Sequence, residues 1–466
     1  MITIIKRELL DNLKSTQFIV LFIVSLVLFA ASSVLSVGAQ EAQMKSYAEK
    51  TIEAAQHPST QSVTLLPRPE TLLFLSHGGA RNLPAEYTLL PGGYRVERGA
   101  TEANYKLPDV PELDWLFVIK LVFSLLVILT GYDTIAGERQ QGTLRLLLSA
   151  PTGRARLLAA KYVAILTTVA VALFCGMLLG LIVAILWLPG LLTMSTLLTV
   201  FMTFLLALFY LSVFALLSLA VSSAVHQSSL ALLLLLAVWV LFTIIVPETS
   251  GVLAEKSAQV PSEFQLAKEV GPTIQKEIWK RIGALQDRIS AGELRTEEEV
   301  RREADRAFSD GQAAFKKYLE QYAIAIRARA ATARSYSRFS PTALFQYAGE
   351  GLAGTGVDKE AKFLRDLIEY STTYDHYVEH KVGKVVTGTF WAFGVTVELN
   401  GKTIFLRSPH PEEYQGDKSD FPAFTETAWS STDRINNALG DAAGLVLWNL
   451  LLAGLSFIAI LRSDVR

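Results

Sequence analysis

Three short patterns in the sequence have residue types that could bind a metal ion, a phosphate or an oxyanion. His376 and His380 are four residues apart, so on a helix they would share a face and either bind a metal ion or lie in solvent. The segment "GKT" (401–403) looks like the end of a phosphate-binding loop, but the glycine that such a loop needs at position 396 is a threonine. The segment "SHGGA" (76–80) has the glycines of an oxyanion loop, yet the chain contains no G-x-S-x-G motif. These patterns give no catalytic set and no nucleotide site, and we expect the chain not to be an enzyme.

A charged stretch, "YDTIAGERQQGTLRLLLSAPTGRARLLAAKY" (132–162), lies between two long apolar runs. Its charged residues are mostly basic: Arg139, Arg145, Arg154, Arg156 and Lys161 against Asp133 and Glu138. Leu144, Leu147 and Leu148 would lie along one side of a short helix, which Pro151 and Gly153 would end. This pattern predicts an amphipathic projection that contacts either another subunit or only lipid headgroups.

The composition indicates that the elements around this stretch are membrane helices. Hydrophobic residues make up 51% of the 466 residues, charged residues only 19%, and the mean hydropathy is +0.34. The net charge of −1 gives no sign of a nucleic-acid partner. The one cysteine, Cys175, excludes an intrachain disulfide.

Apolar runs of about 20 residues predict transmembrane helices, because 1.5 Å per residue then crosses the hydrocarbon core. The sequence has six such runs, at about 18–37, 114–132, 160–187, 193–221, 228–247 and 443–461. We therefore expect a mainly α membrane protein with six transmembrane helices.

Basic residues of the short loops predict the orientation. They gather in the N-terminal stretch, in 133–161 and at the C-terminus, whereas the loop 188–192 has no charge. By the positive-inside rule the basic segments are cytoplasmic. Both termini would then lie inside, and the long segments 39–112 and 248–442 would lie outside.

The first residues have two interpretations. Ile2, Ile5, Leu9 and Leu13 share one helical face, which predicts an interfacial helix before an uncleaved first span, together forming residues 1–38. Alternatively, the same region is a signal peptide that is cleaved after Ala39. Both interpretations give the same orientation.

The two outer segments predict a mixed α/β extracytoplasmic domain. Segment 39–112 begins as a polar helix to Gln56 and then becomes rich in Pro and Gly, as loops and short strands are. Within 248–442, residues 262–335 predict two helices broken near "SAGEL" (290–294), either packed on themselves or exposed for a partner. The apolar stripe of the first helix would be Ile274, Ile278, Ile282, Leu285 and Ile289. The chain should stay partly helical to about His380, and Asn400-Gly401 between two β-rich runs predicts a hairpin.

Several residues inside the predicted spans could interact with one another. Lys120 lies in the second span, where it either pairs or reaches the interface, or lines a substrate pathway. Asn449 should hydrogen-bond a neighbouring helix. Gly176 and Gly180 form a G-x-x-x-G helix-packing face, within the chain or in a dimer.

The stretch "GERQQGTLRLLLSAPTGRARLLAAKY" (137–162) resembles the cytoplasmic signature of ATP-binding-cassette (ABC) type-2 transporter permeases. That signature has an acidic–basic pair, Gly-Thr-Leu, a short apolar helix, a proline and basic residues before the third span. The matching positions here are Glu138, Arg139, Gly142, Thr143, Leu144, Leu147, Pro151, Arg154 and Lys161. The six-span layout with its spans two to five in 113–247, the N-terminal interfacial helix and the basic end of 443–466 also resemble that family. The long segment 248–442 and its stretch "SPTALFQYAGEGLAGTG" (340–356) resemble a subset with a large extracytoplasmic domain before the last transmembrane helix.

The resemblance implies a permease subunit of an ATP-driven exporter in the bacterial cytoplasmic (inner) membrane. A separate ABC ATPase subunit dimer would bind ATP and Mg, so this chain would hold no cofactor. The coupling helix at about 138–151 would lie in a groove of that ATPase. A second permease chain, identical or paralogous, would complete the pathway; the resemblance does not identify the substrate.

Two other functions are consistent with the sequence. The chain could belong to an ATP-driven mechanotransmission or envelope-assembly machine that acts on an envelope protein through its extracytoplasmic domain. It could also be a membrane scaffold or receptor without an ATPase. Stimulated ATP hydrolysis in nanodiscs would exclude the scaffold, and export that survives deletion of 262–335 would argue against the mechanical machine.

Overall fold

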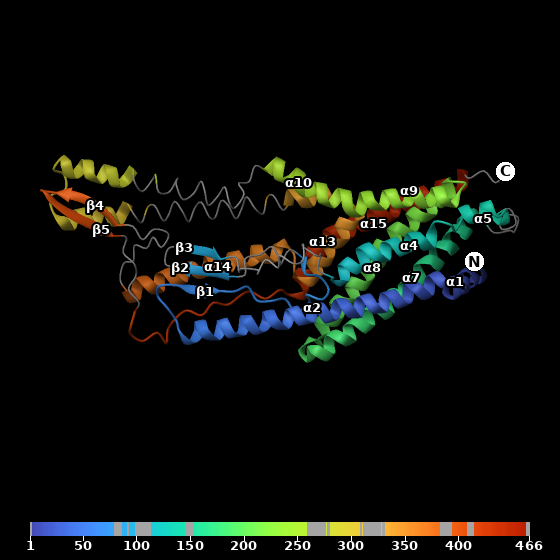
Figure 1. The fold of residues 1–466 in the computed structure, drawn as a ribbon, viewed down its shortest axis with the longest axis horizontal. Helices are drawn as coiled ribbons and strands as arrows, with labels where there is room; N and C mark the ends of the chain where they lie inside the picture. Colours follow the sequence, from blue (N-terminus) through green and yellow to red (C-terminus); the bar gives the residue numbers. More distant parts are fainter. Residues whose placement is uncertain are drawn as a thin grey trace, which may run out of the picture.

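The molecule is long, with a bundle of helices at one end and the β-strands in the part that extends away from it (Figure 1). The structure, a computed structural model, describes residues 2–78, 86–90, 93–97, 113–144, 153–258, 276, 280–307, 310, 328, 331–382, 394–407 and 414–462. Within these residues, six helices are long and apolar enough to cross a membrane. This confirms the predicted fold class.

The six spans are continuous or nearly continuous helices. In chain order they are α2 (Thr16–Gln56); α3 (Trp115–Phe117) with the π-helical turn η2 (Val118–Phe123), α4 (Ser124–Gly131) and α5 (Ala136–Gln140); α7 (Arg154–Trp187); α8 (Met194–Ala224); α9 (Ser228–Val240) with the π-helical turn η4 (Leu241–Ile245) and α10 (Val246–Ala258); and α15 (Ser431–Arg462). The short 3-10 turn η3 (Pro189–Leu191) joins α7 to α8. Both chain ends lie at the same end of this bundle, which we call the terminus end (Figure 1).

Two of these helices extend well beyond the apolar runs that predicted them. The runs 18–37 and 443–461 correspond to α2, which continues to Gln56, and α15, which begins at Ser431. The extra turns are rich in Ala, Glu, Gln and Lys in α2, and these residues favour a helix in water as well as in lipid. The predicted polar helix to Gln56 is thus confirmed as the end of α2, whereas hydropathy located only the apolar part of α15 and not its polar start. α2 also passes through Ala39 without a break.

The predicted N-terminal amphipathic helix is confirmed as α1 (Ile2–Lys14), and it packs against α7. Ser15 separates α1 from α2, and its Oγ caps α2 by accepting a hydrogen bond from Phe18 N at 3.1 Å. The turn at Ser15 fixes α1 beside the start of the third span.

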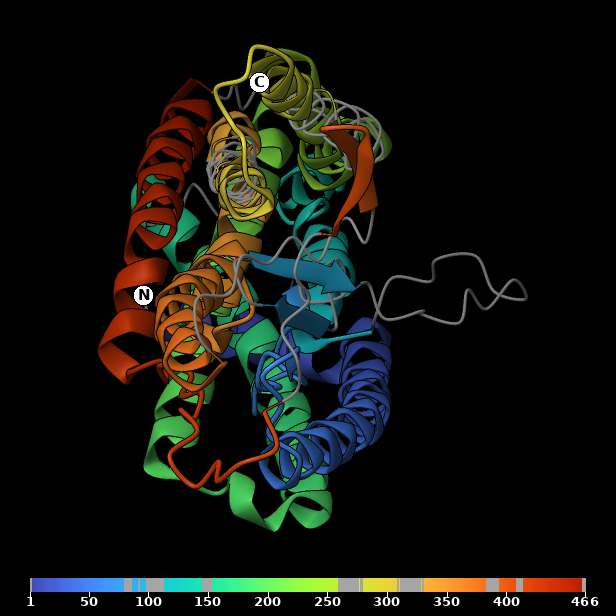
Figure 2. The same ribbon diagram turned by 90° about the vertical axis from the view of Figure 1, so that its left-hand side faces the viewer.

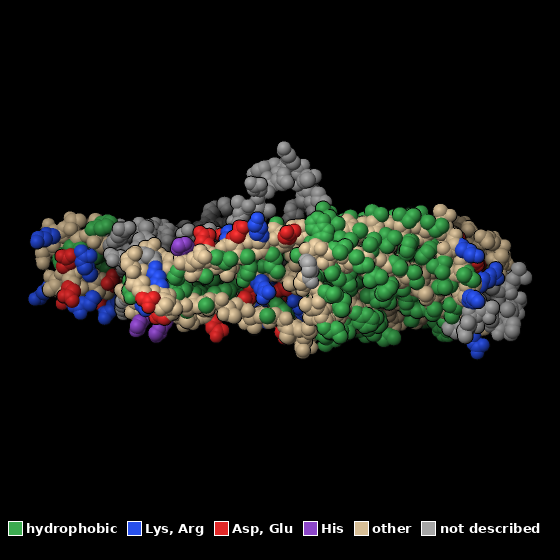
Figure 3. Space-filling view, turned by 90° about the horizontal axis from the view of Figure 1, so that it is seen from below, with side chains coloured by type: hydrophobic (Ala, Val, Ile, Leu, Met, Phe, Trp, Pro, Cys, Tyr) green, Lys and Arg blue, Asp and Glu red, His purple; other side chains and the backbone are tan. Residues whose placement is uncertain are grey.

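On the face seen in Figure 3 an apolar belt covers the bundle, with basic side chains beyond it at the terminus end. Exposed basic residues at that end are Lys6, Arg7, Lys14, Arg156 and Arg462. On the other side of the belt the surface mixes acidic, basic and neutral polar side chains (Figure 3). This pattern is that of a membrane protein with one short and one long polar side.

A short helix, α13 (Pro341–Ala353), joins the bundle to the polar part. Ser340 caps its N-terminus and also donates to Phe242 O in the turn η4. At its C-terminus Gly354 has a φ of +76°, and Arg434 of α15 donates to Leu352 O at 3.3 Å. Phe345 stacks on Tyr210 of α8 with ring centroids 4.5 Å apart. α13 is thus held at both ends and along one face.

The polar extension consists of the described residues 41–78, 86–90, 93–97, 280–307, 357–382, 394–407 and 414–430. Its middle contains a three-stranded antiparallel sheet of β1 (Val63–Leu65), β2 (Glu86–Leu90) and β3 (Gly93–Glu97), in that order. The helix α14 (Val357–Val382) buries Phe363, Leu367 and Tyr374 against Tyr87 and Leu89 of β2. Figure 2 views this arrangement from the far end.

The far end of the polar extension, the tip, is a helical pair that packs on a β-hairpin. The helices 280–290 and 297–307 are joined by a turn with Gly292 at φ +75°. β4 (Gly394–Leu399) and β5 (Lys402–Arg407) pair antiparallel through Asn400 and Gly401, with φ of 52° and 76°, which confirms the predicted hairpin.

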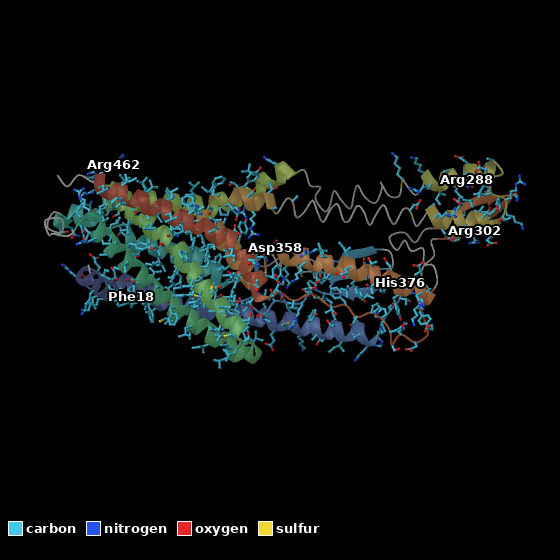
Figure 4. The ribbon with its side chains drawn as sticks, turned by 180° about the vertical axis from the view of Figure 1, so that it is seen from behind. Phe18, Arg288, Arg302, Asp358, His376 and Arg462 are labelled. Atoms are coloured by element: carbon cyan, nitrogen blue, oxygen red, sulfur yellow. The ribbon has the colours of Figure 1, made fainter. Side chains whose placement is uncertain are left out.

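The core of the tip is shared between the helices and the hairpin. Ile282, Leu285 and Ile289 of the predicted apolar stripe pack with Val397 and Ile404. Ile274 and Ile278 lie outside the described residues. The helical pair therefore covers one face of the hairpin in addition to packing on itself. Figure 4 shows Arg288 and Arg302 at the tip, at the opposite end from Arg462.

Candidate functional site

The charged stretch singled out in the sequence forms a compact projection at the terminus end. We call its described residues, 133–144, the knob. A turn at 132–135 follows α4, α5 spans Ala136–Gln140, and Gly142 then takes a φ of +73° that favours glycine. The described helix thus begins at Ala136, slightly before the predicted start at about 138, and residues 145–152 lie outside the described part.

Lys161 of α7 is the centre of the contacts that hold the knob. Its side chain is only 2% exposed, and its Nζ donates to Glu138 Oε1 at 2.7 Å and to Glu8 Oε1 at 3.0 Å. One ammonium group therefore joins α5, α7 and α1. Removing one partner of a buried ion pair leaves an uncompensated charge, which is strongly unfavourable.

Arg139 attaches the knob to the fourth span. Its guanidinium donates to Ser223 O and Val225 O, both at 3.1 Å, at the C-terminal end of α8, where helix carbonyls lack partners within the helix. In the opposite direction, Ser222 Oγ accepts from Ile135 N at 3.1 Å and Ala136 N at 3.0 Å. α8 and α5 thus cap each other.

Two glycines, Gly131 and Gly137, allow close packing in and next to the knob. A Cβ on Gly131 would lie 2.6 Å from the Cβ of Ser218, so the backbone of α4 packs directly on the Ser218 side chain of α8. A Cβ on Gly137 would collide with the side chain of Asp133, which accepts a hydrogen bond from Ser228 at the start of α9. The knob is therefore in contact with α1, α7, α8 and α9.

The outer surface of the knob is made by other residues than its anchors. Glu138 and Arg139 turn inward, and Leu144 is 3% exposed and packs in the bundle core. Gln140, Gln141, Gly142 and Thr143 are exposed. Leu147 and Pro151 of the predicted coupling set lie outside the described residues. The contact of this set with an ATPase stays a prediction.

Arg154, at the start of α7, connects the C-terminal part of the charged stretch 132–162 to the last span. Its Nη1 donates to Leu461 O at 2.8 Å and Ile460 O at 3.2 Å, near the end of α15. The two sides of the charged stretch are thus fixed to different helices.

Lys120 lies in the turn η2 at the opposite end of the bundle. Its Nζ donates to Gln346 Oε1 of α13 at 3.1 Å, and Gln346 Nε2 in turn donates to Glu350 at 2.7 Å. Lys120 thus pairs within the chain, and its role in a substrate pathway stays a prediction.

The other predicted membrane residues lie between helices of this chain. Asn449 of α15 accepts from Ser212 Oγ at 2.5 Å and donates to Phe209 O at 2.9 Å, both in α8. Cβ atoms on Gly176 and Gly180 would lie 2.6 Å from Phe29 and 2.8 Å from Trp115. The G-x-x-x-G face of α7 is therefore used within the chain, against α2 and α3.

The two histidines on α14 are exposed. His376 and His380 line a shallow pocket of about 510 Å³ with Asp420. Among the described residues no group of three or more His, Cys, Asp or Glu side chains could hold a metal ion.

The segment "GKT" (401–403) consists of the hairpin turn and the first residues of β5. A strand therefore follows it, as the sequence predicted.

Sequence reasoning missed Glu8 and Ser222. Glu8 is 153 residues from Lys161 in the chain, and no local pattern pairs them. The available signal was general: a lysine at the start of an apolar helix needs a counter-charge, and Glu8 lies on the polar side of an amphipathic helix.

Comparison with known families gives one match. The sequence model of the ABC-2 family transporter proteins matches residues 2–361, which include the knob, the first five spans and α13. Comparison with curated proteins gives no match. Because the family match covers most of the chain and the six apolar helices agree with it, the chain belongs to the ABC-2 family and is a multi-pass membrane permease of an ABC transporter.

Proposed function

We propose that the chain is the permease subunit of an ATP-driven exporter and that a separate ATPase subunit dimer binds the knob. The sequence has no phosphate-binding loop, so ATP and Mg would be bound by that ATPase. A second permease chain would complete the pathway.

The buried Lys161 is the observation that carries this proposal. A subunit that pushes on the exposed residues Gln140–Thr143 would push on α5, whose Glu138 is bound to α7 and α1 through one ammonium. Arg139 extends the same connection to α8. The geometry therefore supports transmission of movement from the knob to several spans at once.

Charge supports the orientation. Lys6, Arg7, Lys14, Arg156 and Arg462 are exposed at the terminus end, and the positive-inside rule assigns an end rich in basic residues to the cytoplasm. The polar extension would then be extracytoplasmic, on the outer side of a bacterial inner membrane.

A mechanical machine is the second candidate, and one feature favours it. α2 is a single helix of 41 residues, about twice the ~20 residues that a bilayer needs. Its polar half is part of the polar extension, so movement of the first span would reach an envelope partner outside without any flexible linker.

The test is ATP hydrolysis by the ATPase subunit with and without this chain in nanodiscs. We expect the chain alone to hydrolyse no ATP. We expect hydrolysis by the ATPase subunit to be faster when the chain is present. Gln141→Asp places a charge on the exposed surface of the knob. An uncompensated polar group in a contact costs roughly 2 kcal/mol, or about 30-fold in the docking constant.

Gln43→Asp is the matched control, because Gln43 is exposed on α2 at the other side of the belt. We expect it to leave docking and stimulation unchanged. Equal docking of the Gln141→Asp variant and the native chain would contradict the knob as the ATPase site. Export that stops when the tip is removed, with hydrolysis intact, would favour the mechanical machine.

A further inference from the structure

A groove runs along the outside of the bundle between α7, α8 and α15. It has a volume of about 640 Å³, and apolar side chains of all three helices line it, among them Leu158, Leu166, Phe209, Leu450 and Phe457. Phe209 and Leu450 are 49% and 65% exposed, so the groove opens outward within the apolar belt. α15 lies beside α8 along its length, with Arg462 at the terminus end (Figure 4).

The groove has the length of one membrane leaflet. Its lining extends from Ala155 to Leu166 on α7 and from Val446 to Phe457 on α15. At 1.5 Å per residue each stretch rises about 16 Å, which is about half of the hydrocarbon core of ~30 Å. Because Ala155 is near the start of α7 and Phe457 near the end of α15, the groove belongs to the leaflet at the terminus end.

The few polar groups in the groove already have partners. Tyr162 and Ser212 share a hydrogen bond of 2.6 Å, and Ser212 donates to Asn449 Oδ1 at 2.5 Å. Asn449 Nδ2 donates to Leu445 O and Phe209 O, both at 2.9 Å. The groove therefore offers an apolar chain a surface without unsatisfied polar groups, and it offers a polar solute little.

Two basic residues lie at the level of the groove's terminus end. Arg154 and Arg156 precede and follow the lining residue Ala155 in α7, and among the described residues that line the groove none is acidic. The guanidinium of Arg154 already reaches across to the end of α15, and Arg156 is exposed. Basic residues at the level of the headgroups attract anionic lipids.

We propose that this groove binds an acyl chain of an anionic phospholipid from the leaflet at the terminus end, with the lipid phosphate beside Arg154 and Arg156. A second copy of the chain in the same orientation would bring the same arginines against this end of the groove, so charge favours the lipid. The proposal does not depend on an ATPase or on the direction of transport.

The test uses phosphatidylglycerol that carries a photoreactive diazirine on one acyl chain, in nanodiscs with phosphatidylcholine. After irradiation we expect crosslinks to concentrate on 155–166 and 446–457, and to be rarer on α9, where Leu233 is 65% exposed to lipid. Crosslinks distributed evenly over the belt of the native chain would overturn the proposal without any variant.

Two variants separate the apolar and basic parts of the site. Ala159→Phe with Ala453→Phe fills the groove and should abolish the concentrated crosslinks, whereas Val171→Phe, on the lipid face of α7 outside the groove, should leave them. Arg156→Gln should weaken the preference for phosphatidylglycerol over phosphatidylcholine about fivefold. Arg7→Gln, which removes an exposed charge from α1, should not.

Unchanged crosslinks in the filled variant would overturn the acyl-chain site. An unchanged lipid preference in Arg156→Gln would overturn the assignment of an anionic headgroup. If filling the groove dissociates a dimer while the crosslinks persist, a second copy occupies the groove and the proposal is wrong.

Discussion

Lys161 is a single cation shared by two carboxylates from distant parts of the chain. We predict that Lys161→Met destabilises the protein by about 3–5 kcal/mol, because Glu8 and Glu138 would then face each other without a positive charge. The measurement is the thermal unfolding midpoint of the detergent-purified protein, together with its abundance in membranes.

The triple change Glu8→Gln, Lys161→Met and Glu138→Gln is the control for this prediction. It removes both negative charges with the positive one, so it should recover much of the lost stability. A Lys161→Met protein as stable as the native chain would show that the ammonium is not the anchor of the knob.

Glu350, at the C-terminal end of α13, should make stability depend on pH. Burial raises the pKa of this carboxyl from 4.5 to about 7, against the opposing effects of the Gln346 hydrogen bond and the positive charge of Lys120. A raised pKa in the folded state favours the protonated form. This contribution to stability is fully present below about pH 4.5 and is lost as the pH rises through about 7.

We therefore predict that the unfolding midpoint of the native chain falls between about pH 5 and pH 8, and that Glu350→Gln flattens this fall. Glu369→Gln, an exposed position on α14, is the matched control and should keep the native pH dependence. Identical pH profiles for Glu350→Gln and the native chain would contradict the prediction.

At the scale of residues, the sequence located the charged stretch but not the contacts that its side chains make. Glu138, Arg139 and Lys161 are recognisable by type and spacing. That Glu138 and Arg139 point into the bundle depends on Glu8 and on the C-terminal carbonyls of α8, which are brought close only by the fold. Pairing over such separations leaves no trace in local periodicity.

At the scale of elements, the packing of α7 on α2 and α3 depends on glycine. We predict that Gly180→Ala destabilises the bundle by about 1–3 kcal/mol, because its Cβ would lie 2.8 Å from Trp115 Cζ2 and 2.9 Å from Ser33 Oγ, and neither side can move freely. Gly454→Ala on α15 is the control, since a Cβ there meets nothing within 4 Å. Comparison of their unfolding midpoints is the measurement, and equal values would contradict tight packing at Gly180.

Among the helices and strands, those with a clear pattern of apolar or turn residues were predicted well. The six spans, α1, and the Asn400-Gly401 hairpin follow from runs of residues a few positions apart, and all are present. The polar helix to Gln56 was also predicted and is the end of α2, whereas the polar start of α15 and the π-helical turns η2 and η4 were not predicted. A helix continues beyond its apolar part wherever its side chains and caps permit. A π-helical turn depends on neighbouring helices that donate to its carbonyls, as the Tyr210 hydroxyl donates to Lys120 O at 2.9 Å.

At the scale of the whole molecule, the knob and the tip should lie on opposite sides of the membrane. After Cys175 is replaced by Ser, we predict that an impermeant maleimide labels Ser290→Cys in cells whose outer membrane is permeable to it, and labels Gln141→Cys only after lysis. Both positions are exposed, so neither is protected by burial. Labelling of Gln141→Cys alone in intact cells would reverse the orientation.

The length of α2 has a kinematic consequence. Its 41 residues make a rod of about 60 Å. If the rod pivots near its terminus end, a tilt of about 5° moves its far end by about 5 Å, as much as one turn of helix. Gly38 lies near the middle of this rod, and a Cβ there would meet nothing within 4 Å, so an alanine would fit and would favour the helix more than glycine does. A stiff rod would amplify a small rotation of the first span into a displacement large enough to rearrange the polar extension.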